Sequence, residues 1–384
     1  MPVERLLPTV EAEELLALVR EICAEQIAPC AAEGELLSAF PRDIVTLLGK
    51  SGLLSLPYPE RFGGGDQPYE VYLQVLEEIA AAWMTLGIAV SVHSLSAYAV
   101  YAHGSDEQRA ALLPDILGGQ QLGAWALSES QAGSDVAGIS TRAVRDGDGY
   151  LLNGTKAWVS QGGVADFYIV FVRTGPDPKK GLSTFHLPAD VDGLSFAPPE
   201  KKMGLSASPT CQLRLDDVRV PEAWRIGREG DGMKIALAAL DSGRLGIAAC
   251  GTGVAQAALD VAVTYATERE QFHRTIGEFQ GVQFLLADMA AAVESSRATY
   301  VQAARMRDAG RPFSRQASIA KLVCTDGAMK VTTDAVQVLG GYGYTRDFPV
   351  ERYMREAKVT QIFEGTNQIQ RMVIGRDLLR RAVG

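Results

Sequence analysis

One carboxylate near the C-terminus stands in a context suited to proton abstraction. The segment Gln361–Gln370 reads QIFEGTNQIQ, and it places Glu364 after Ile362 and Phe363 and directly before Gly365. A carboxylate in an apolar pocket has its pKa raised toward the working pH, which suits a general base. Taken alone, the pattern is more typical of a solvated glutamate at the end of a helix.

Two further segments have the residue types of a site for a flat polar ligand. Trp125–Asp135 (WALSESQAGSD) combines small residues with hydroxyls, so backbone N–H groups and Ser128 can hydrogen-bond the edge of a ring. In Asn153–Gly163 (NGTKAWVSQGG), Trp158 can cover a ring face and Ser160 can donate a hydrogen bond near it. Composition alone favours plainer interpretations, a Ser/Gly turn and a hairpin with a core tryptophan.

Two more segments follow predicted long helices. Glu268–Phe272 (EREQF) places Arg269 at a helix end, where a guanidinium can hold a diphosphate by charge-assisted hydrogen bonds. Gln337–Gly341 (QVLGG) ends in glycines that allow a ligand to approach the backbone. The ordinary alternatives are a surface arginine and a helix C-cap.

The overall composition narrows the class of protein. The chain of 384 residues is 47% hydrophobic, enough for a large core divided among two or three subdomains. Its net charge is −9 with no cluster of Lys or Arg, so neither nucleic acid nor an anionic membrane is an expected partner. The five scattered cysteines form no C-x-x-C pair, so we expect reduced thiols in a cytoplasmic protein. No metal site is expected.

The chain shows no pattern of a signal peptide or of a membrane-spanning helix. Its N-terminus carries Glu4 and Arg5 and then further acidic residues, without an apolar core. The longest apolar run, residues 79–101, is interrupted by Ser91 and His93. We therefore expect a pair of buried helices there rather than a membrane span.

Hydrophobic periodicity predicts an α+β chain of three domains, with boundaries at residues 1–122, 123–230 and 231–384. The first domain is helical. Its expected helices cover residues 10–31 (ended by Pro29), 42–54, 68–102, and a last segment that begins at a capping box of Ser105 and Gln108 and ends at Gly118.

The middle domain has a period near two and predicts six to eight short strands. Asp146–Gly149 and Asn153–Gly154 are both typical of hairpin turns, and strands are expected over 167–172 and 211–220. In the last domain the period is helical again. The expected helices cover residues 233–268, 280–309, 313–339, 350–354 and 368–381.

The motifs described above, taken together, resemble the acyl-CoA dehydrogenase family. AGSD (132–135), WVSQGG (158–163), EREQF (268–272), QVLGGYGY (337–344) and FEGTNQIQR (363–371) occur in the family's order over nearly the whole chain. The resemblance implies a helical N-terminal domain, a middle β-barrel-like domain and a C-terminal four-helix bundle. It also implies an FAD cofactor and a homotetramer built as a dimer of dimers.

The resemblance assigns a role to individual residues. Glu364 matches the catalytic base. Some family members carry the base on the long helix instead, at the position of Gly243, which cannot serve. Positions matching FAD contacts are Trp125, Leu127, Ser128, Ser134, Trp158, Ser160, Thr366 and Gln368, together with Arg269, Phe272, Gln280, Gln337 and Gly341, which in the family reach the FAD of a neighbouring subunit. Positions matching acyl-CoA contacts are Ser134, Asp241, Arg244 and Gly365.

The implied reaction is the α,β-dehydrogenation of an acyl-CoA thioester to a trans-2-enoyl-CoA, as in fatty acid β-oxidation. The electrons would pass to an electron-transferring flavoprotein. Gly243 together with Glu364 resembles short-chain or short-branched-chain members. The helix around 86–98 is expected to set the depth of the acyl pocket.

Three alternatives remain open from the sequence. The first is a flavin oxidase of the same fold, although a nitroalkane oxidase would carry Asp in place of Glu364. The second is a dehydrogenase that acts on an acyl group held by a carrier protein. The third is a helical scaffold that has lost its flavin, against which the complete set of motifs argues.

Overall fold

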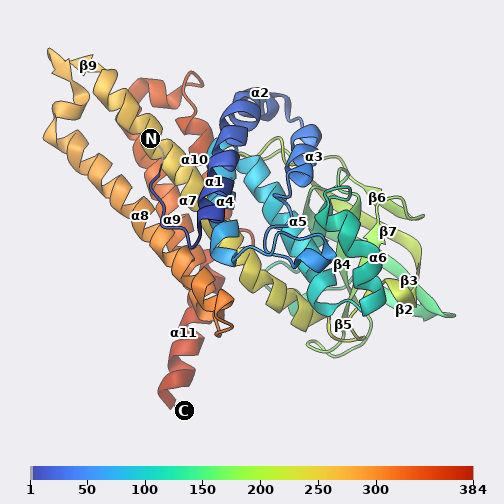
Figure 1. Cartoon of the computed structure of the whole chain (residues 1–384). Helices are drawn as coiled ribbons and strands as arrows, with labels where there is room; N and C mark the ends of the chain where they lie inside the picture. Colours follow the sequence, from blue (N-terminus) through green and yellow to red (C-terminus); the bar gives the residue numbers. More distant parts are fainter. Residues whose placement is uncertain (1–2, 384) are drawn as a thin grey trace.

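The computed structural model describes residues 3–383, which form an α+β fold of three packed regions (Figure 1). The N-terminal helices lie between a β-sheet on one side and a bundle of long helices on the other. These N-terminal helices are α1 (Val10–Ile22), α2 (Ala28–Leu37), α3 (Arg42–Lys50), α4 (Tyr69–Ala82), α5 (Met84–His103) and α6 (Asp106–Leu117).

The first predicted helix does not end at Pro29, so that expectation was wrong. α1 leads into a π-helical turn at Cys23–Ile27, and α2 begins at Ala28 with Pro29 in its first turn. Proline is tolerated there because its missing N–H is not needed in a first helical turn. The chain therefore stays helical to Leu37.

The predicted boundaries of the next helices are mostly confirmed. α3 ends at Lys50 rather than at residue 54, since Gly52 takes a left-handed conformation with φ 72°. The capping box of α6 is present, with the Ser105 hydroxyl accepting from the Gln108 N–H and the Gln108 side chain accepting from the Ser105 N–H. This box is worth about 1 kcal/mol of helix stability.

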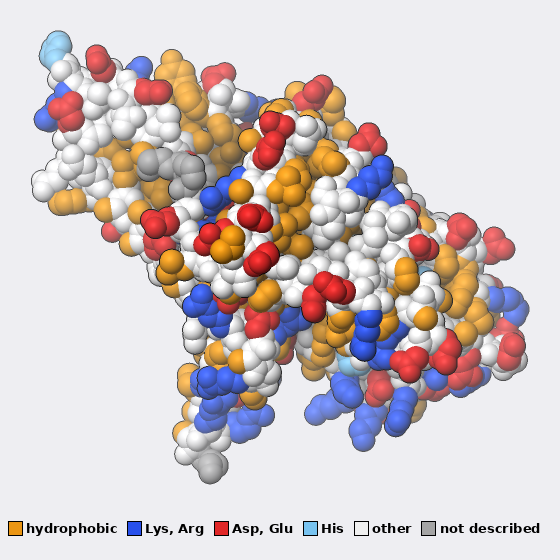
Figure 2. All heavy atoms as spheres, in the orientation of Figure 1, with side chains coloured by type: hydrophobic (Ala, Val, Ile, Leu, Met, Phe, Trp, Pro, Cys, Tyr) orange, Lys and Arg blue, Asp and Glu red, His pale blue; other side chains and the backbone are white. Residues whose placement is uncertain are grey.

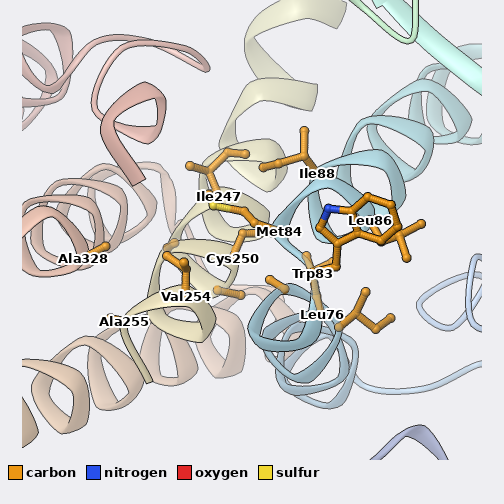
Figure 3. Close-up of a cluster of buried hydrophobic side chains, with 14 of the residues drawn as sticks. Leu76, Trp83, Met84, Leu86, Ile88, Ile247, Cys250, Val254, Ala255 and Ala328 are labelled. Carbon is orange, nitrogen blue, oxygen red and sulfur yellow. The ribbon is translucent and has the colours of Figure 1, made fainter. Parts of the chain in front are cut away.

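The apolar run at 79–101 forms the expected pair of buried helices. α4 and α5 are separated at Trp83, whose backbone is extended and whose indole N–H donates to Glu35 Oε1 at 2.9 Å. α5 and the later helix α7 (Gly232–Glu268) are long and apolar enough to cross a membrane, but most of each lies inside the protein. Figure 3 shows this core, where Ile247, Cys250 and Val254 of α7 lie with apolar side chains of α4 and α5.

The middle region contains one eight-stranded sheet, in agreement with the expected six to eight strands. Its order is β6-β7-β3-β2-β4-β5-β8, and β1 pairs in parallel with β4. The strands are β1 (Gly123–Ala126), β2 (Arg142–Asp146), β3 (Gly149–Ser160), β4 (Phe167–Arg173), β5 (Leu182–Pro188), β6 (Leu194–Phe196), β7 (Thr210–Pro221) and β8 (Arg225–Ile226).

β4 is buried on both faces, which explains its continuous apolar sequence. Phe167, Ile169 and Phe171 pack into a cluster with α5 and α6, whereas the alternate residues Tyr168 and Val170 pack with β3 and β7. This alternation is the period of two that a strand imposes. The sheet therefore joins the helical region through one face of its central strands.

Only one of the two predicted hairpin turns exists. Asp146 and Gly149 pair across the tight turn between β2 and β3, as expected. Asn153–Gly154 lies instead within β3, at a register shift against β7. Gly154 has φ 144°, and a Cβ there would lie 2.8 Å from Thr141 Cα, so the glycine serves a bulge where two backbones approach closely.

The C-terminal region consists of α7 followed by four further helices. α7 is joined to α8 by a two-stranded hairpin, which lies at the far end of the bundle from the sheet (Figure 1). The helix α10 is longer than the predicted segment 350–354. The elements are β9 (Glu270–Gln271), β10 (Arg274–Thr275), α8 (Gln280–Asp308), α9 (Ser314–Leu339), α10 (Val350–Thr360) and α11 (Asn367–Val383).

α11 projects away from the body of the protein (Figure 1). Figure 2 shows basic side chains gathered over this projection, whereas acidic and further basic side chains are spread over the rest of the visible face. Within α11, Asp377 pairs with both Arg380 and Arg381 in the last turns. The net charge of −9 is thus unevenly distributed.

α7 approaches its neighbours closely because its buried face is made of small residues. The carbonyl oxygen of Glu77 in α4 occupies the space that a Cβ at Gly253 would need. A backbone carbonyl cannot rotate away as a side-chain end can. The glycine is therefore required by the separation of α4 and α7.

We predict that Gly253→Ala destabilises the protein by about 1–3 kcal/mol, the usual cost of overpacking, although alanine is the better helix former. The matched control is Gly281→Ala in α8, where a Cβ meets nothing within 4 Å. That control should be neutral or slightly stabilising. Thermal unfolding followed by circular dichroism checks both, and an unchanged midpoint for Gly253→Ala would contradict the packing argument.

Candidate active site

Glu364 lies in the turn between α10 and α11, in a backbone conformation that few side chains adopt. Its φ is 53°, and Gly365 follows with φ 86°. A non-glycine residue in this region costs of order 1–3 kcal/mol, so the surrounding contacts must hold it there. Such strain is typical of functional positions.

A buried lysine hydrogen-bonds this turn. Lys321 of α9 is fully buried, and its Nζ donates to the carbonyl oxygen of Gly365 at 2.9 Å and to Asn367 Oδ1 at 2.8 Å. The Gln370 amide also donates to the Gly365 carbonyl at 2.8 Å. Together these bonds fix the backbone that directly follows Glu364 and so help to fix the direction of its side chain.

The Glu364 carboxylate points toward Gly243 of α7, the position at which some family members carry the base. A Cβ at Gly243 would lie 2.8 Å from Glu364 Oε2 and 3.3 Å from Leu95 Cδ1. Oε2 is buried and has no hydrogen-bond partner among the described residues. Burial raises the pKa of Glu364 to about 7, while Arg244 and Lys321 oppose the rise. The carboxylate is therefore placed and tuned as a general base near neutral pH.

Lys321 was missed by the sequence analysis. Burial lowers the pKa of Lys321 to about 7, and the nearby Glu364 carboxylate opposes that shift. The only signal in the sequence is a lone lysine in an apolar helical stretch, SIAKLV, which is equally typical of a surface helix. The role of Lys321 follows only from the packing of α9 against the turn that carries Glu364.

Arg244 and Asp241 form a tight pair next to this carboxylate. Arg244 Nη1 donates to Asp241 Oδ1 at 2.6 Å, and the Ser314 hydroxyl donates to the same oxygen at 3.0 Å. Burial raises the pKa of Asp241, and Arg244 and Ser314 oppose that rise. The buried Arg244 Nε has no partner among the described residues, so it remains available to a ligand.

The structure brings the two predicted ring-binding segments together. The Ala157 N–H donates to the Ser128 carbonyl oxygen at 2.9 Å, which joins 125–135 to 153–163. Trp158 takes φ 60° at a register shift in β3 and is 60% exposed, which leaves its ring face open. The Trp125 indole N–H is buried without a partner among the described residues. Leu127 is buried and Ser160 half-buried nearby, while Ser134 is exposed.

A buried ion pair, also missed by the sequence analysis, holds these segments. Lys156 Nζ donates to Glu129 Oε1 at 2.8 Å and to the Leu127 carbonyl oxygen at 3.1 Å. Burial would raise the pKa of Glu129, but Lys156 and the hydrogen bonds from Ser140 and Thr141 lower it to about 2. The charged pair thus fixes the loop that carries Ser128.

The predicted diphosphate-binding residues form a separate site. Arg269 follows the end of α7, and with Gly341 it lines a cavity of about 480 Å³ beside the β9–β10 hairpin. The Arg269 guanidinium lies 5.8 Å from the Tyr342 ring centre, and Phe272 is 85% exposed. A Cβ at Gly341 would meet nothing within 4 Å, so the backbone is open to a ligand.

The remaining predicted FAD-contact residues lie either near the β9–β10 hairpin or at the start of α11. Gln280 and Gln337 are exposed and flank the hairpin end. Thr366 accepts from the Ile369 N–H at 3.2 Å and so caps α11, and Gln368 is exposed beside it. Figure 1 shows the hairpin end of α7 at the opposite side of the molecule from β3. Arg269 and Trp158 of one chain therefore cannot contact one small ligand together.

Known proteins resemble this chain over all three of its regions. Family models of the acyl-CoA dehydrogenase N-terminal, middle and C-terminal domains match residues 9–120, 124–218 and 230–379. An acyl-CoA dehydrogenase of Bacillus subtilis is 42% identical over 97% of this chain and 98% of its own length.

Two solved structures are similar over 98% of this chain and all of theirs. One is butyryl-CoA dehydrogenase of Megasphaera elsdenii, with 37% identity and a TM-score of 0.96. The other belongs to a structure described as the electron-transferring flavoprotein of Acidaminococcus fermentans, with 40% identity and a TM-score of 0.95.

The chain belongs to the acyl-CoA dehydrogenase family. It is an oxidoreductase that acts on CH–CH groups, and its cofactor is FAD. The residues present fit that cofactor. The exposed Trp158 and the unpartnered Trp125 indole N–H suit a flavin ring, and Arg269 with the open backbone at Gly341 suits a diphosphate.

We predict that Lys321→Met lowers the rate of flavin reduction and moves its pH dependence upward. Glu364 must be deprotonated to act, so in the wild type this rate should rise with pH through about 7. Loss of the Lys321 charge removes a stabiliser of the carboxylate and should shift the rise by on the order of one pH unit.

The matched control is Lys330→Met, which removes an exposed lysine of α9 that pairs with Asp334. Stopped-flow measurement of flavin bleaching from pH 5.5 to 9 checks both variants. A Lys321→Met profile superimposable on that of the control would show that Lys321 has only a structural role.

Proposed function

We propose that this protein oxidises a short-chain acyl-CoA thioester to the trans-2-enoyl-CoA and passes the electrons to an electron-transferring flavoprotein. It does so as a homotetramer in which each flavin site is completed by a second copy. The observation that carries the proposal is the Glu364 carboxylate, which lies against Gly243 in a turn held by Lys321 and has its pKa raised by burial to about 7.

Glu364 removes the proton next to the thioester carbonyl. Its Oε2 has no protein partner within the described chain, so the orbital that accepts the proton is free. Arg244 and Lys321 keep part of the carboxylate population ionised despite burial. Trp158 and the Trp125 indole N–H would hold the ring of bound FAD, which would supply the complementary chemistry of a hydride acceptor.

The backbone at Glu364 can also stabilise the charge that develops on the thioester oxygen. In the described chain the Glu364 N–H donates no hydrogen bond. Lys321 holds the Gly365 carbonyl and so fixes the backbone that follows this N–H. A positioned donor of this kind typically contributes about 10²–10³ in rate.

The space beyond Glu364 supports a short acyl group. A cavity of about 10 Å³ between α4, α5 and α7 lies next to Gly243, with room for about one water-sized group. We call it the acyl cavity. A long apolar chain does not fit without displacement of the surrounding helices.

The opposite positions of Arg269 and Trp158 support the shared flavin site. A second copy can place its hairpin end over the Trp158 segment, as a two-fold interface requires. The similarity to a chain in a structure described as an electron-transferring flavoprotein supports that partner as the electron acceptor.

We predict that Glu364→Gln abolishes flavin reduction while FAD and thioester binding persist. Glutamine keeps the shape of the side chain but cannot accept the α-proton. The rate of bleaching on anaerobic mixing with butyryl-CoA should fall by at least ~10²–10⁴. Bleaching at near the wild-type rate would place the base elsewhere, and flavin absorbance of the purified variant reports whether FAD is retained.

We further predict that two inactive variants restore each other's activity when co-expressed. Arg269→Ala damages the flavin site of the partner, whereas Glu364→Gln damages the site of its own chain. A mixed dimer then contains one intact site, so random mixing should restore about a quarter of wild-type activity. Each variant expressed alone is the control, and mixtures without recovery would show that the two residues serve one chain's site.

A further inference from the structure

The acyl cavity is polar, although it must receive part of an acyl group. Four tyrosines, three serines and Arg307 line it, and the other two lining residues are Leu95 and Gly243. Polar groups buried without a partner cost about 1–3 kcal/mol each. A purely hydrocarbon chain end would therefore be a poor occupant.

Some of the polar groups that line the cavity already form hydrogen bonds within the protein. The Tyr58 hydroxyl donates to the Ser94 carbonyl oxygen at 2.5 Å, and the Tyr69 hydroxyl donates to the Ser242 carbonyl oxygen at 3.1 Å. Among the described residues, no hydrogen bond engages the hydroxyls of Ser91 or Tyr98. These two groups remain free to bind a ligand.

Arg307 of α8 supplies an unpaired positive charge at the edge of the cavity. Its guanidinium carbon lies 3.5 Å from the Tyr69 ring centre, and it has no carboxylate within ion-pair distance in the described chain. Its neighbours on α8 are engaged. Arg305 pairs with Glu70 at 2.8 Å, and Asp308 accepts from the Tyr69 and Glu70 N–H groups.

The surrounding charges favour an anion at this place. Tyr69 is the first residue of α4, so Arg307 stands at the positive end of that helix dipole. The acidic group Asp241 is already paired with Arg244 and Ser314. A guanidinium that lacks a carboxylate partner is well matched to a carboxylate ligand.

The cavity lies on the path of the acyl group. Gly243 lines the cavity, and a Cβ built on it would lie 2.8 Å from Glu364 Oε2, so the cavity begins beside the proposed base. Tyr69 then extends from the Ser242 carbonyl to Arg307. One tyrosine side chain thus lies between the backbone next to Gly243 and the free cation, and this short separation suits a short acyl group.

We propose that the acyl cavity is a subsite for a terminal carboxylate, and that the substrate is a short acyl thioester ending in a carboxylate held by Arg307 with Tyr98 and Ser91. The inference rests on the proposed function, because it concerns the far end of the same substrate. Arg307 here is a binding residue for specificity and takes no part in the proton transfer.

The test compares two five-carbon acyl groups that differ only at the far end, pentanoyl-CoA and glutaryl-CoA. The corresponding trans-2-enoyl thioesters are titrated into the flavin-loaded enzyme by calorimetry, and bleaching with the saturated thioesters is followed separately. The wild type should bind the carboxylate-ended product about 10-fold or more tightly than the plain product, the value of one charge-assisted contact.

Arg307→Met should lose about 10- to 100-fold in affinity for the carboxylate-ended product and less than about threefold for the plain one. Arg307→Lys should retain part of the preference. Arg305→Met is the matched control, because it removes an exposed cation two residues away, and it should leave the ratio of the two affinities unchanged.

Equal binding of the two products by the wild type, or an equal loss with Arg305→Met, would overturn the subsite. Bleaching by pentanoyl-CoA alone would overturn the subsite and leave the proposed function standing. If the wild type binds the carboxylate-ended product more tightly than the plain product, but neither saturated thioester bleaches the flavin, the result would support the subsite and reject the proposed reaction.

Discussion

The close packing of the small-residue face of α7 is the constraint on which the rest of the structure depends. At Gly253 the helix fits against the Glu77 carbonyl of α4, and at Gly243 it leaves room for the Glu364 carboxylate. The same helix therefore joins the N-terminal region to the bundle and creates the space for the base. A side chain at either position would move α7 or displace the carboxylate.

Buried charges fix the parts of the site that packing alone leaves free. Lys321 binds the turn after Glu364, Lys156 binds the loop that carries Ser128, and Glu77 joins α4 to Arg5 and Arg297. For Glu77, burial would raise the pKa, but the two arginines lower it to about 2. Such pairs contribute little net stability compared with apolar packing, yet removal of one partner costs about 3–5 kcal/mol. They select one arrangement of each loop.

The two groups of residues proposed to hold the flavin lie at opposite ends of one chain, so the proposed site needs two copies of the chain. Trp158 stands at the sheet and Arg269 at the far end of the bundle (Figure 1). A single copy presents each half to solvent, with an exposed ring at one end and an open cavity at the other. The polarity of the acyl cavity is a separate property, set by Tyr58 and by residues of α4, α5, α7 and α8 within one chain.

The sequence by itself determined the order of helices and strands and the capping box at Ser105, and it singled out Glu364 as the proposed base, because these follow from local periodicity and from motifs of adjacent residues. It misplaced the end of the first helix and took Asn153–Gly154 for a turn, since a π-helical turn and a bulge depend on what packs beside them. Only the tertiary structure showed Lys321 next to the Glu364 turn, because Lys321 and Gly365 are 44 residues apart in the sequence. The pKa of Glu364 was likewise decided there, since burial and the distances to charges belong to the folded chain.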